Sequence, residues 1–203
     1  MKKLAVFASG AGSNAQKIIE KFRNHPDMRV SLVVCNKPGA GVINIALMAG
    51  LPVLMIERER FMKGDAYIPE LAAAGIDAII LAGFLWKVPD NLVDAYRGRI
   101  LNIHPALLPA HGGKGMYGMH VHASVIASGD TRSGITIHLV DERYDHGDTI
   151  FQAEITVRPG ETAESLAARI HELEHRHFPV VIEKFFTEPG GPPVERPAES
   201  LSS

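Results

Sequence analysis

The chain has 203 residues, of which 46% are hydrophobic and 22% are charged, and its formal net charge of −2 excludes a strongly basic nucleic-acid surface as its main feature. No apolar run approaches the roughly 20 residues that a membrane-spanning helix needs. The single cysteine, Cys35, excludes an internal disulfide. We therefore expect a cytoplasmic protein in which Cys35 is a small buried strand residue and not a catalytic one.

Apolar, β-rich runs alternate with segments of helical period along the first half of the chain. Strands are predicted at 3–9, 28–36, 52–56, 76–84 and 99–104, and helices at 13–22, 41–50, 65–74 and 89–96. The first helix carries an apolar stripe from Ala15 to Phe22, and Ser13 is predicted to be its N-cap. This alternation predicts an α/β fold with a doubly wound, mostly parallel sheet.

The pattern changes in the second half. A short helix is predicted at 120–128, followed by strands at 134–140 and 149–157, which we expect to form an antiparallel pair added to the sheet. A long C-terminal helix is predicted at 162–186. Residues 187–203 are rich in Pro, Gly and Ser and predict a disordered tail, so that 1–186 form the one domain.

The segment SGAGSN, residues 9–14, lies between the first strand and the first helix. Glycines allow a ligand to approach the backbone, and a helix N-terminus offers free N–H groups, so the segment fits a phosphate. A dinucleotide fits less well, because Ala15 replaces the third glycine of the dinucleotide motif and Asn36 ends the second strand in place of an acid. A glycine turn without any ligand is the simpler alternative.

The segment NIHP ends the fifth predicted strand. Asn102 and His104 are two residues apart, so both side chains lie on the same side of that strand. A histidine suits proton transfer, and an asparagine amide can donate to a forming oxyanion. The alternative is a pair of hydrogen-bonded polar residues in the core.

The turn DERYDHG places Asp145 after the first strand of the antiparallel pair. The functional interpretation is a carboxylate beside His104 that raises the pKa of the histidine and orients it. The alternative is an ordinary Asp-x-Gly turn.

The sequence HELEH, residues 171–175, matches the zinc motif H-E-x-x-H formally. His171 and His175 lie one turn apart on the predicted helix. A catalytic zinc would need a third ligand and a cleft, and the short pattern matches by chance often. We expect no metal.

Together, SGAGSN, LAGFLWKVP, LNIHPALLP and GITIHLVDERYDHGDTIFQ resemble, in this order, the folate-dependent glycinamide ribonucleotide formyltransferases of purine synthesis. The resemblance runs from about Lys3 to Phe186. It implies transfer of a formyl group from 10-formyltetrahydrofolate to the amine of 5'-phosphoribosylglycinamide. It also implies small-molecule substrates without nucleic acid or membrane, and a monomer or a homodimer.

The resemblance assigns Asn102, His104 and Asp145 as the catalytic trio, with Asn102 and protonated His104 stabilising the reacting oxygen and Asp145 keeping His104 charged. The phosphate loop becomes Gly12, Ser13 and Asn14, and Glu174 contacts the ribose, which accounts for HELEH without zinc. The residues assigned to folate are Leu85, Trp86, Lys87, Val88, Asn102 and Asp141.

The chain also departs from the family pattern. Ala106 stands where many relatives have Ser, the loop from 110 to 119 is longer and richer in glycine, and a folate-contacting Arg of some relatives falls near Gly64, with Lys63 beside it. The loop could act as a mobile flap over the substrates.

Enzymes with the same catalytic domain are alternatives. A methionyl-tRNA formyltransferase would need a further C-terminal domain and a basic surface, which the chain length and the acidic net charge disfavour. A formyltetrahydrofolate hydrolase would usually carry an extra N-terminal domain, which a first strand at Lys3 disfavours. A sugar-nucleotide formyltransferase would bind a diphosphate, which a single-phosphate loop disfavours. A non-catalytic nucleotide-binding module would keep SGAGSN but would not need the trio.

Overall fold

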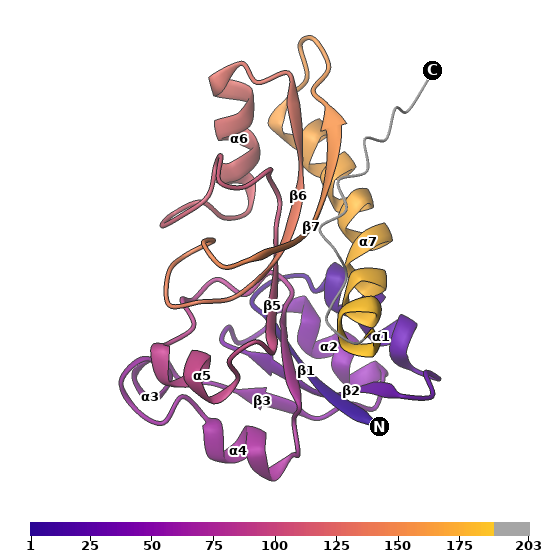
Figure 1. Cartoon of the computed structure of the whole chain (residues 1–203), viewed down its shortest axis with the longest axis vertical. Coiled ribbons are helices and arrows are strands. Elements are labelled where there is room, and N and C mark those ends of the chain that lie inside the picture. Colours follow the sequence, from indigo (N-terminus) through magenta and orange to yellow (C-terminus); the bar gives the residue numbers. More distant parts are fainter. Residues whose placement is uncertain (189–203) are drawn as a thin grey trace. The chain divides into compact units, whose positions relative to one another are not determined.

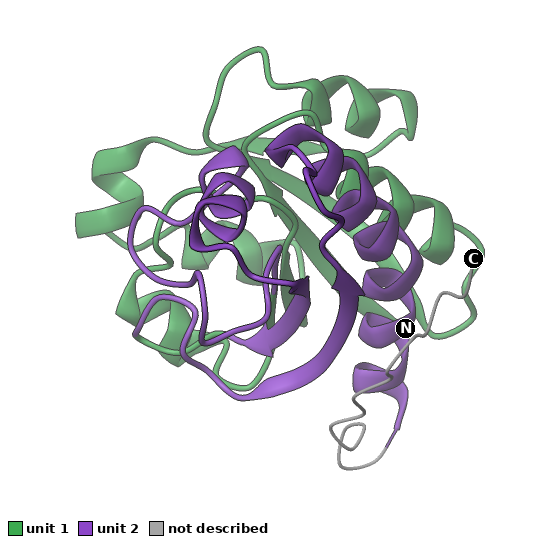
Figure 2. Cartoon of the chain, turned by 90° about the horizontal axis from the view of Figure 1, so that it is seen from above, with its two compact units in different colours: residues 1–102, 140–142 green, residues 103–139, 143–203 purple. Residues whose placement is uncertain are grey.

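The computed structural model describes residues 1–188, and these fall into two compact units (Figure 2). Unit 1 comprises Met1–Asn102 and Val140–Glu142, and unit 2 comprises Ile103–Leu139 and the chain from Arg143 onward. The boundary passes through one strand, between Asn102 and Ile103. The expectation of a single domain over 1–186 stays a prediction.

Unit 1 contains the predicted alternation of strands and helices. Its strands are β1 (Lys2–Ala8), β2 (Met28–Cys35), β3 (Val53–Met55), β4 (Ala78–Leu81) and the first residues of β5 (Ile100–His104). Its helices are α1 (Ser13–Phe22), α2 (Gly41–Met48), α3 (Arg58–Lys63), α4 (Ile68–Ala73) and α5 (Asp90–Ala95).

The strands of unit 1 are paired in parallel, with β1 between β2 and β4, β3 beside β2, and β5 beside β4. Each βα connection returns the chain across a face of the sheet, and Figure 1 shows α1 and α2 on one side of these strands and α3 to α5 on the other. This agrees with the predicted doubly wound arrangement.

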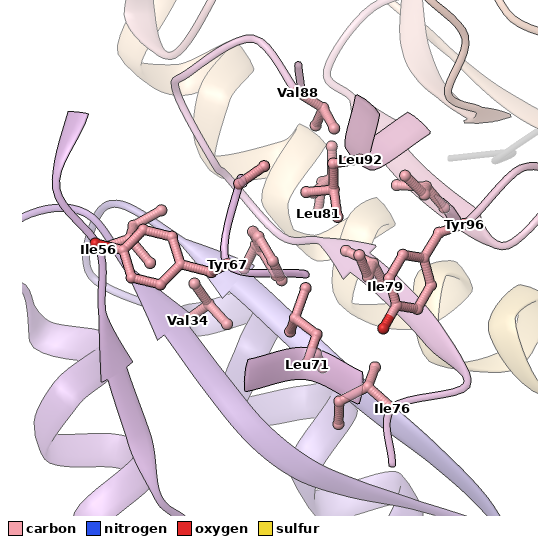
Figure 3. Packing of buried hydrophobic residues seen from close by; sticks show 14 of the residues in the cluster. Val34, Ile56, Tyr67, Leu71, Ile76, Ile79, Leu81, Val88, Leu92 and Tyr96 are labelled. Atoms are coloured by element: carbon pink, nitrogen blue, oxygen red, sulfur yellow. The ribbon is translucent and has the colours of Figure 1, made fainter. Parts of the chain in front are cut away.

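Successive side chains of β1 point to opposite faces of the sheet. Ala5 and Phe7 belong to a buried cluster that also contains Phe61 of α3, Leu71 of α4 and Leu92 of α5. Figure 3 shows this packing, with Leu71 and Ile79 among the residues in the middle of the cluster. The stripe predicted for α1, Ala15 to Phe22, is buried as expected.

Unit 1 differs from the prediction in two local features. Helix α3 was not predicted, because a six-residue charged segment with Phe61 as its one buried residue shows no apolar period. Ser13 is not the N-cap of α1 but its first residue. Gly12 occupies the cap position with a φ of 85°, and no side chain caps the helix.

Unit 2 contains α6 (Met119–Ser128), β6 (Arg132–Leu139), β7 (Thr149–Thr156) and the long helix α7 (Ala163–Thr187). Strands β6 and β7 are antiparallel, as predicted, with Thr136 opposite Gln152. The hydrogen-bonded strand order is β3-β2-β1-β4-β5-β6-β7 in a seven-stranded sheet. The predicted fold class is confirmed.

Cys35 is fully buried in β2, as its strand context predicted. Of the predicted disordered tail, Thr187 still belongs to α7 and Glu188 is its C-cap, whereas residues 189–203 lie outside the described residues. In the described part of the chain, no helix is both long and apolar enough to cross a membrane.

Candidate active site

The loop between β1 and α1 brings main-chain N–H groups to the carboxyl end of the sheet of unit 1. Gly12 adopts a left-handed φ of 85°, and a Cβ at this position would lie 2.7 Å from Cβ of Val42. Only glycine therefore fits between the loop and α2. No side-chain hydrogen bond caps α1, and the positive end of a helix dipole favours an anion.

The same loop is tied to the segment after β4. The Ser9 hydroxyl accepts a hydrogen bond from the Leu85 amide at 2.9 Å, and the Ser9 amide donates to the Gly83 carbonyl at 3.0 Å. The predicted phosphate loop and the predicted folate segment of Leu85 to Val88 thus lie next to one another. Leu85 is exposed, whereas Val88 is buried.

Within the folate segment, Lys87 forms an ion pair with Asp90 at 3.0 Å. The Arg60 guanidinium, one turn before Gly64, is engaged by Asp65 at 3.0 Å and by Glu70 at 2.6 Å. Arg60 is thus paired with two carboxylates of unit 1.

Strand β5 carries the predicted polar pair. Asn102 is half-buried, and His104 ends the strand with 3% of its surface exposed. Because side chains alternate along a strand, both residues lie on the same side of β5, as predicted.

His104 has a different partner on each ring nitrogen. Nε2 lies 2.8 Å from the main-chain oxygen of His111, and Nδ1 lies 3.7 Å from Oδ2 of Asp145. A carbonyl oxygen only accepts, so Nε2 carries a hydrogen and donates it. Nδ1 is then the ring atom at which His104 gains or loses a proton, and it faces the carboxylate.

Asp145 receives further support inside unit 2. Its Oδ2 accepts a hydrogen bond from the Gly113 amide at 2.8 Å, and its Oδ1 lies 3.8 Å from Nε2 of His138. The other ring nitrogen of His138, Nδ1, donates to the Leu139 carbonyl at 2.7 Å. Sequence reasoning missed His138, because one histidine in the apolar strand GITIHLV looks like a core residue.

Burial and charge oppose one another in this group. Burial is the largest influence on His104 and holds its pKa below the ordinary value, although Asp145 and the His111 carbonyl act to raise it. Asp145 thus acts on the pKa of His104 in the predicted direction, but burial outweighs it. That Asp145 keeps His104 charged stays a prediction.

Asp145 is affected in the opposite way. Burial acts to raise its pKa, but the contacts with His138 and His104 and the Gly113 hydrogen bond together outweigh burial and leave the pKa of the carboxyl below its ordinary value. Asp145 is therefore ionised at neutral pH.

The glycine-rich loop supplies the backbone groups that hold this pair. His111 and Gly113 have left-handed φ values of 54° and 96°. In this loop the His111 carbonyl faces His104 and the Gly113 amide faces Asp145. Gly112 lies between them, and a Cβ there would come within 2.5 Å of Leu108 Cδ2. The flap proposed for this loop stays a prediction.

Glu174 is buried on α7. The His171 and His175 rings stack on the same helix with centroids 6.4 Å apart, and His171 also meets His122 of α6 edge-on at 6.4 Å. Within residues 1–188, no group of three or more His, Cys, Asp or Glu side chains has a geometry that could hold a metal ion.

Comparisons with known proteins identify a family. The formyl transferase family matches residues 2–182, nearly all of the described chain.

The chain belongs to the formyl transferase family.

Relatives within the family carry more specific names. The phosphoribosylglycinamide formyltransferase of Bacillus subtilis is 39% identical over 189 residues, which cover 91% of this chain and 94% of the relative. The chloroplastic phosphoribosylglycinamide formyltransferase of Arabidopsis thaliana is 43% identical over 187 residues, or 89% of this chain. The chain spans 64% of the length of that relative, less than two thirds.

Solved structures in the family share the fold. The crystal structure of phosphoribosylglycinamide formyltransferase from Bacillus halodurans superposes with a TM-score of 0.84 at 34% identity and covers 92% of this chain and 96% of that chain.

The structure brings some of the predicted site residues together and leaves others apart. In unit 2 it joins His104 to Asp145, and in unit 1 it joins the phosphate loop to the folate segment. Asp141 belongs to unit 1, through the segment Val140–Glu142, whereas Glu174 belongs to unit 2. The roles given to these residues remain proposals.

Proposed function

We propose that this chain is a phosphoribosylglycinamide formyltransferase that transfers the formyl group of 10-formyltetrahydrofolate to the amine of 5'-phosphoribosylglycinamide. The observation that carries the proposal is the family match over residues 2–182, with a Bacillus subtilis relative of that name covered over 94% of its length. The His104–Asp145 pair, at 3.7 Å, supplies the chemistry that such a transfer needs.

In the proposed reaction, the amine nitrogen attacks the formyl carbon, and the bond from that carbon to the folate nitrogen then breaks. The amine loses a proton and the folate nitrogen gains one. His104 suits this proton transfer, because its pKa lies below the ordinary value and the neutral ring accepts a proton at Nδ1. Asp145 stabilises the ring while it carries the proton.

Asn102 supplies the second part of the proposed chemistry. Its amide N–H donates to the formyl oxygen as negative charge develops there, and this changes no charge on the protein. Residues Gly12 to Asn14 hold the phosphate of the acceptor and Glu174 accepts from a ribose hydroxyl. The folate is held by Leu85 to Val88 and by Asp141.

We further propose that residues 1–186 act as one catalytic domain, on small-molecule substrates and without a bound metal. The proposed location is the cytoplasm, where Cys35, buried in β2, stays reduced. Fluorescence microscopy of the tagged chain tests the location, and accumulation in an organelle, as the name of the Arabidopsis relative indicates for that protein, would contradict it.

The decisive experiment supplies purified protein with 10-formyltetrahydrofolate and one acceptor at a time. Tetrahydrofolate release and mass detection of the formylated product should both appear with 5'-phosphoribosylglycinamide. Neither should appear at a useful rate with methionyl-tRNA or an amino-sugar nucleotide. Rapid release without any acceptor would indicate a hydrolase, and no release with any acceptor would indicate a binding module.

A further inference from the structure

His111 contacts three different parts of unit 2. Its main-chain oxygen accepts from Nε2 of His104 at 2.8 Å. Its own ring reaches the other way, with Nδ1 at 2.8 Å from the Ser124 hydroxyl of α6 and Nε2 at 2.6 Å from Oδ2 of Asp130. The side chain of His111 therefore connects α6 and the turn after it to the backbone group that holds His104.

The backbone of His111 needs such support. Its φ of 54° lies in the left-handed region, where the Cβ of an L-residue crowds the following carbonyl oxygen. That conformation aims the carbonyl at His104. The two hydrogen bonds of the ring fix the side chain, and with it the orientation of the residue.

We propose that His111 is a positioning residue for His104, which its ring anchors through Ser124 and Asp130. While the His111 carbonyl accepts from Nε2, the His104 ring cannot flip, and Nδ1 stays turned toward Asp145. Without the anchor the carbonyl turns away, and both ring nitrogens of His104 become free to face the carboxylate.

The anchor works in both charge states of His111. In the neutral ring, Nε2–H donates to the Asp130 carboxylate and Nδ1 accepts from the Ser124 hydroxyl. In the protonated ring, Nδ1–H donates to the same hydroxyl oxygen. A hydroxyl suits this position because it can exchange the two roles.

The base of the loop is held separately. Thr136 accepts from the Leu108 amide at 2.9 Å and donates to the Ala106 carbonyl at 2.7 Å, and Gln152 donates to the Leu108 carbonyl at 3.0 Å. These bonds do not involve His111. A variant that releases the His111 ring should therefore keep the loop attached to β6 and β7.

The test uses Asp130→Ala, Ser124→Ala and the double variant in the full chain, because neither residue contacts His104. The matched control is Glu154→Gln, which removes an exposed ion pair with Arg132 in the same unit. Nitrogen-15 NMR of the His104 ring reports whether a hydrogen-bonded Nε2–H is present, and this readout needs no substrate.

We expect the control, like the parent chain, to show one His104 state with a slowly exchanging Nε2–H. The double variant should lose that signal. Asp130→Glu, which keeps a carboxylate, should retain more of the signal than Asp130→Ala does. An unchanged Nε2–H signal in a folded double variant would overturn the proposal. If the double variant does not fold, the single variant Asp130→Ala, which removes the acceptor of the His111 Nε2–H and keeps Ser124, decides in the same way.

A kinetic readout rests on the proposed function. In the double variant, kcat for formyl transfer should fall roughly tenfold or more while KM for the acceptor changes little, because a displaced catalytic ring impairs the chemical step. A parent chain without formyl transfer would refute the proposed function and leave the NMR result to decide on His111. Loss of the Nε2–H signal with an unchanged kcat would overturn the positioning role.

Discussion

His122 of α6 gives the most quantitative expectation, which concerns stability in acid. Its side chain is 2% exposed, its Nδ1 is buried without a hydrogen-bond partner among the described residues, and its ring meets that of His171 edge-on. Burial, followed by the repulsion from His171, lowers the pKa of His122 from 6.5 to about 4. The folded protein therefore holds this ring neutral.

The sign of the effect follows from proton binding. Between pH 6.5 and about pH 4, the unfolded chain binds a proton at His122 that the folded chain excludes, so stability falls as the pH falls through this window. The pKa difference between the unfolded and the folded state corresponds to about 3 kcal/mol of unfolding free energy, since each pKa unit is worth about 1.4 kcal/mol. About 2 kcal/mol of this stability is lost when the pH has fallen to about 5. Below about pH 4, both states are protonated and this loss stops growing.

The assay is urea unfolding of the parent chain and of His122→Phe, a flat ring that does not titrate, from neutral pH to about pH 5. The stability of the variant relative to the parent should rise by about 2 kcal/mol over this range. The matched control is His120→Phe, an exposed residue on the same helix. Equal pH dependence in the His122 variant and the parent would refute the reasoning.

Four further expectations concern the candidate site. His104→Ala should lower turnover by about 100-fold or more in a protein with an unchanged circular dichroism spectrum, and near-normal turnover would contradict the assignment. Asp145→Asn should lower the pKa of His104 further, because it removes the carboxylate that acts to raise it, and an NMR titration with equal pKa values in both proteins would exclude this influence. Gly12→Ala should lower the free energy of unfolding by roughly 1–3 kcal/mol and raise KM for the phosphate-bearing acceptor, because the new Cβ would crowd Val42. The control Gly10→Ala, whose Cβ would have nothing within 4 Å, should stay near the parent in stability. Equal unfolding midpoints for the two variants would argue against a tight contact at Gly12. Activity should survive exhaustive chelation, and a loss that zinc restores would favour the metal interpretation of the C-terminal helix.

The alternation of apolar strands and amphipathic helices was enough to predict the parallel half of the fold. Apolar runs such as the one in β1 and apolar stripes such as Ala15 to Phe22 indicate directly which residues become buried on folding. The antiparallel pair was predicted for the same reason. Helix α3 could not be predicted, because its one buried residue, Phe61, is recruited by tertiary packing and not by a repeating pattern.

The site was predictable only where a side chain carries the chemistry. Asn102, His104 and Asp145 are chemically distinctive residues at strand ends or turns, so sequence reasoning could propose them. His138 was missed because its neighbours in β6 are apolar, and its nearness to Asp145 depends on how the following turn folds back. The role of the His111 carbonyl was beyond sequence reasoning, because every residue has one.

The position of the proton on His104 follows from these backbone contacts. Had Nε2 been exposed, either nitrogen could have served as the base, and the carboxylate would have been one partner among several. With Nε2–H committed to the His111 carbonyl, the proton of the proposed reaction has to enter at Nδ1, 3.7 Å from Asp145. Burial keeps the resting ring neutral, so the ring is ready to accept a proton from the attacking amine, and the ionised Asp145 stabilises it once it has done so. The loop after the strand supplies both backbone groups, since the His111 carbonyl accepts from the histidine and the Gly113 amide donates to the aspartate, and Gly112 between them has no room for a Cβ beside Leu108.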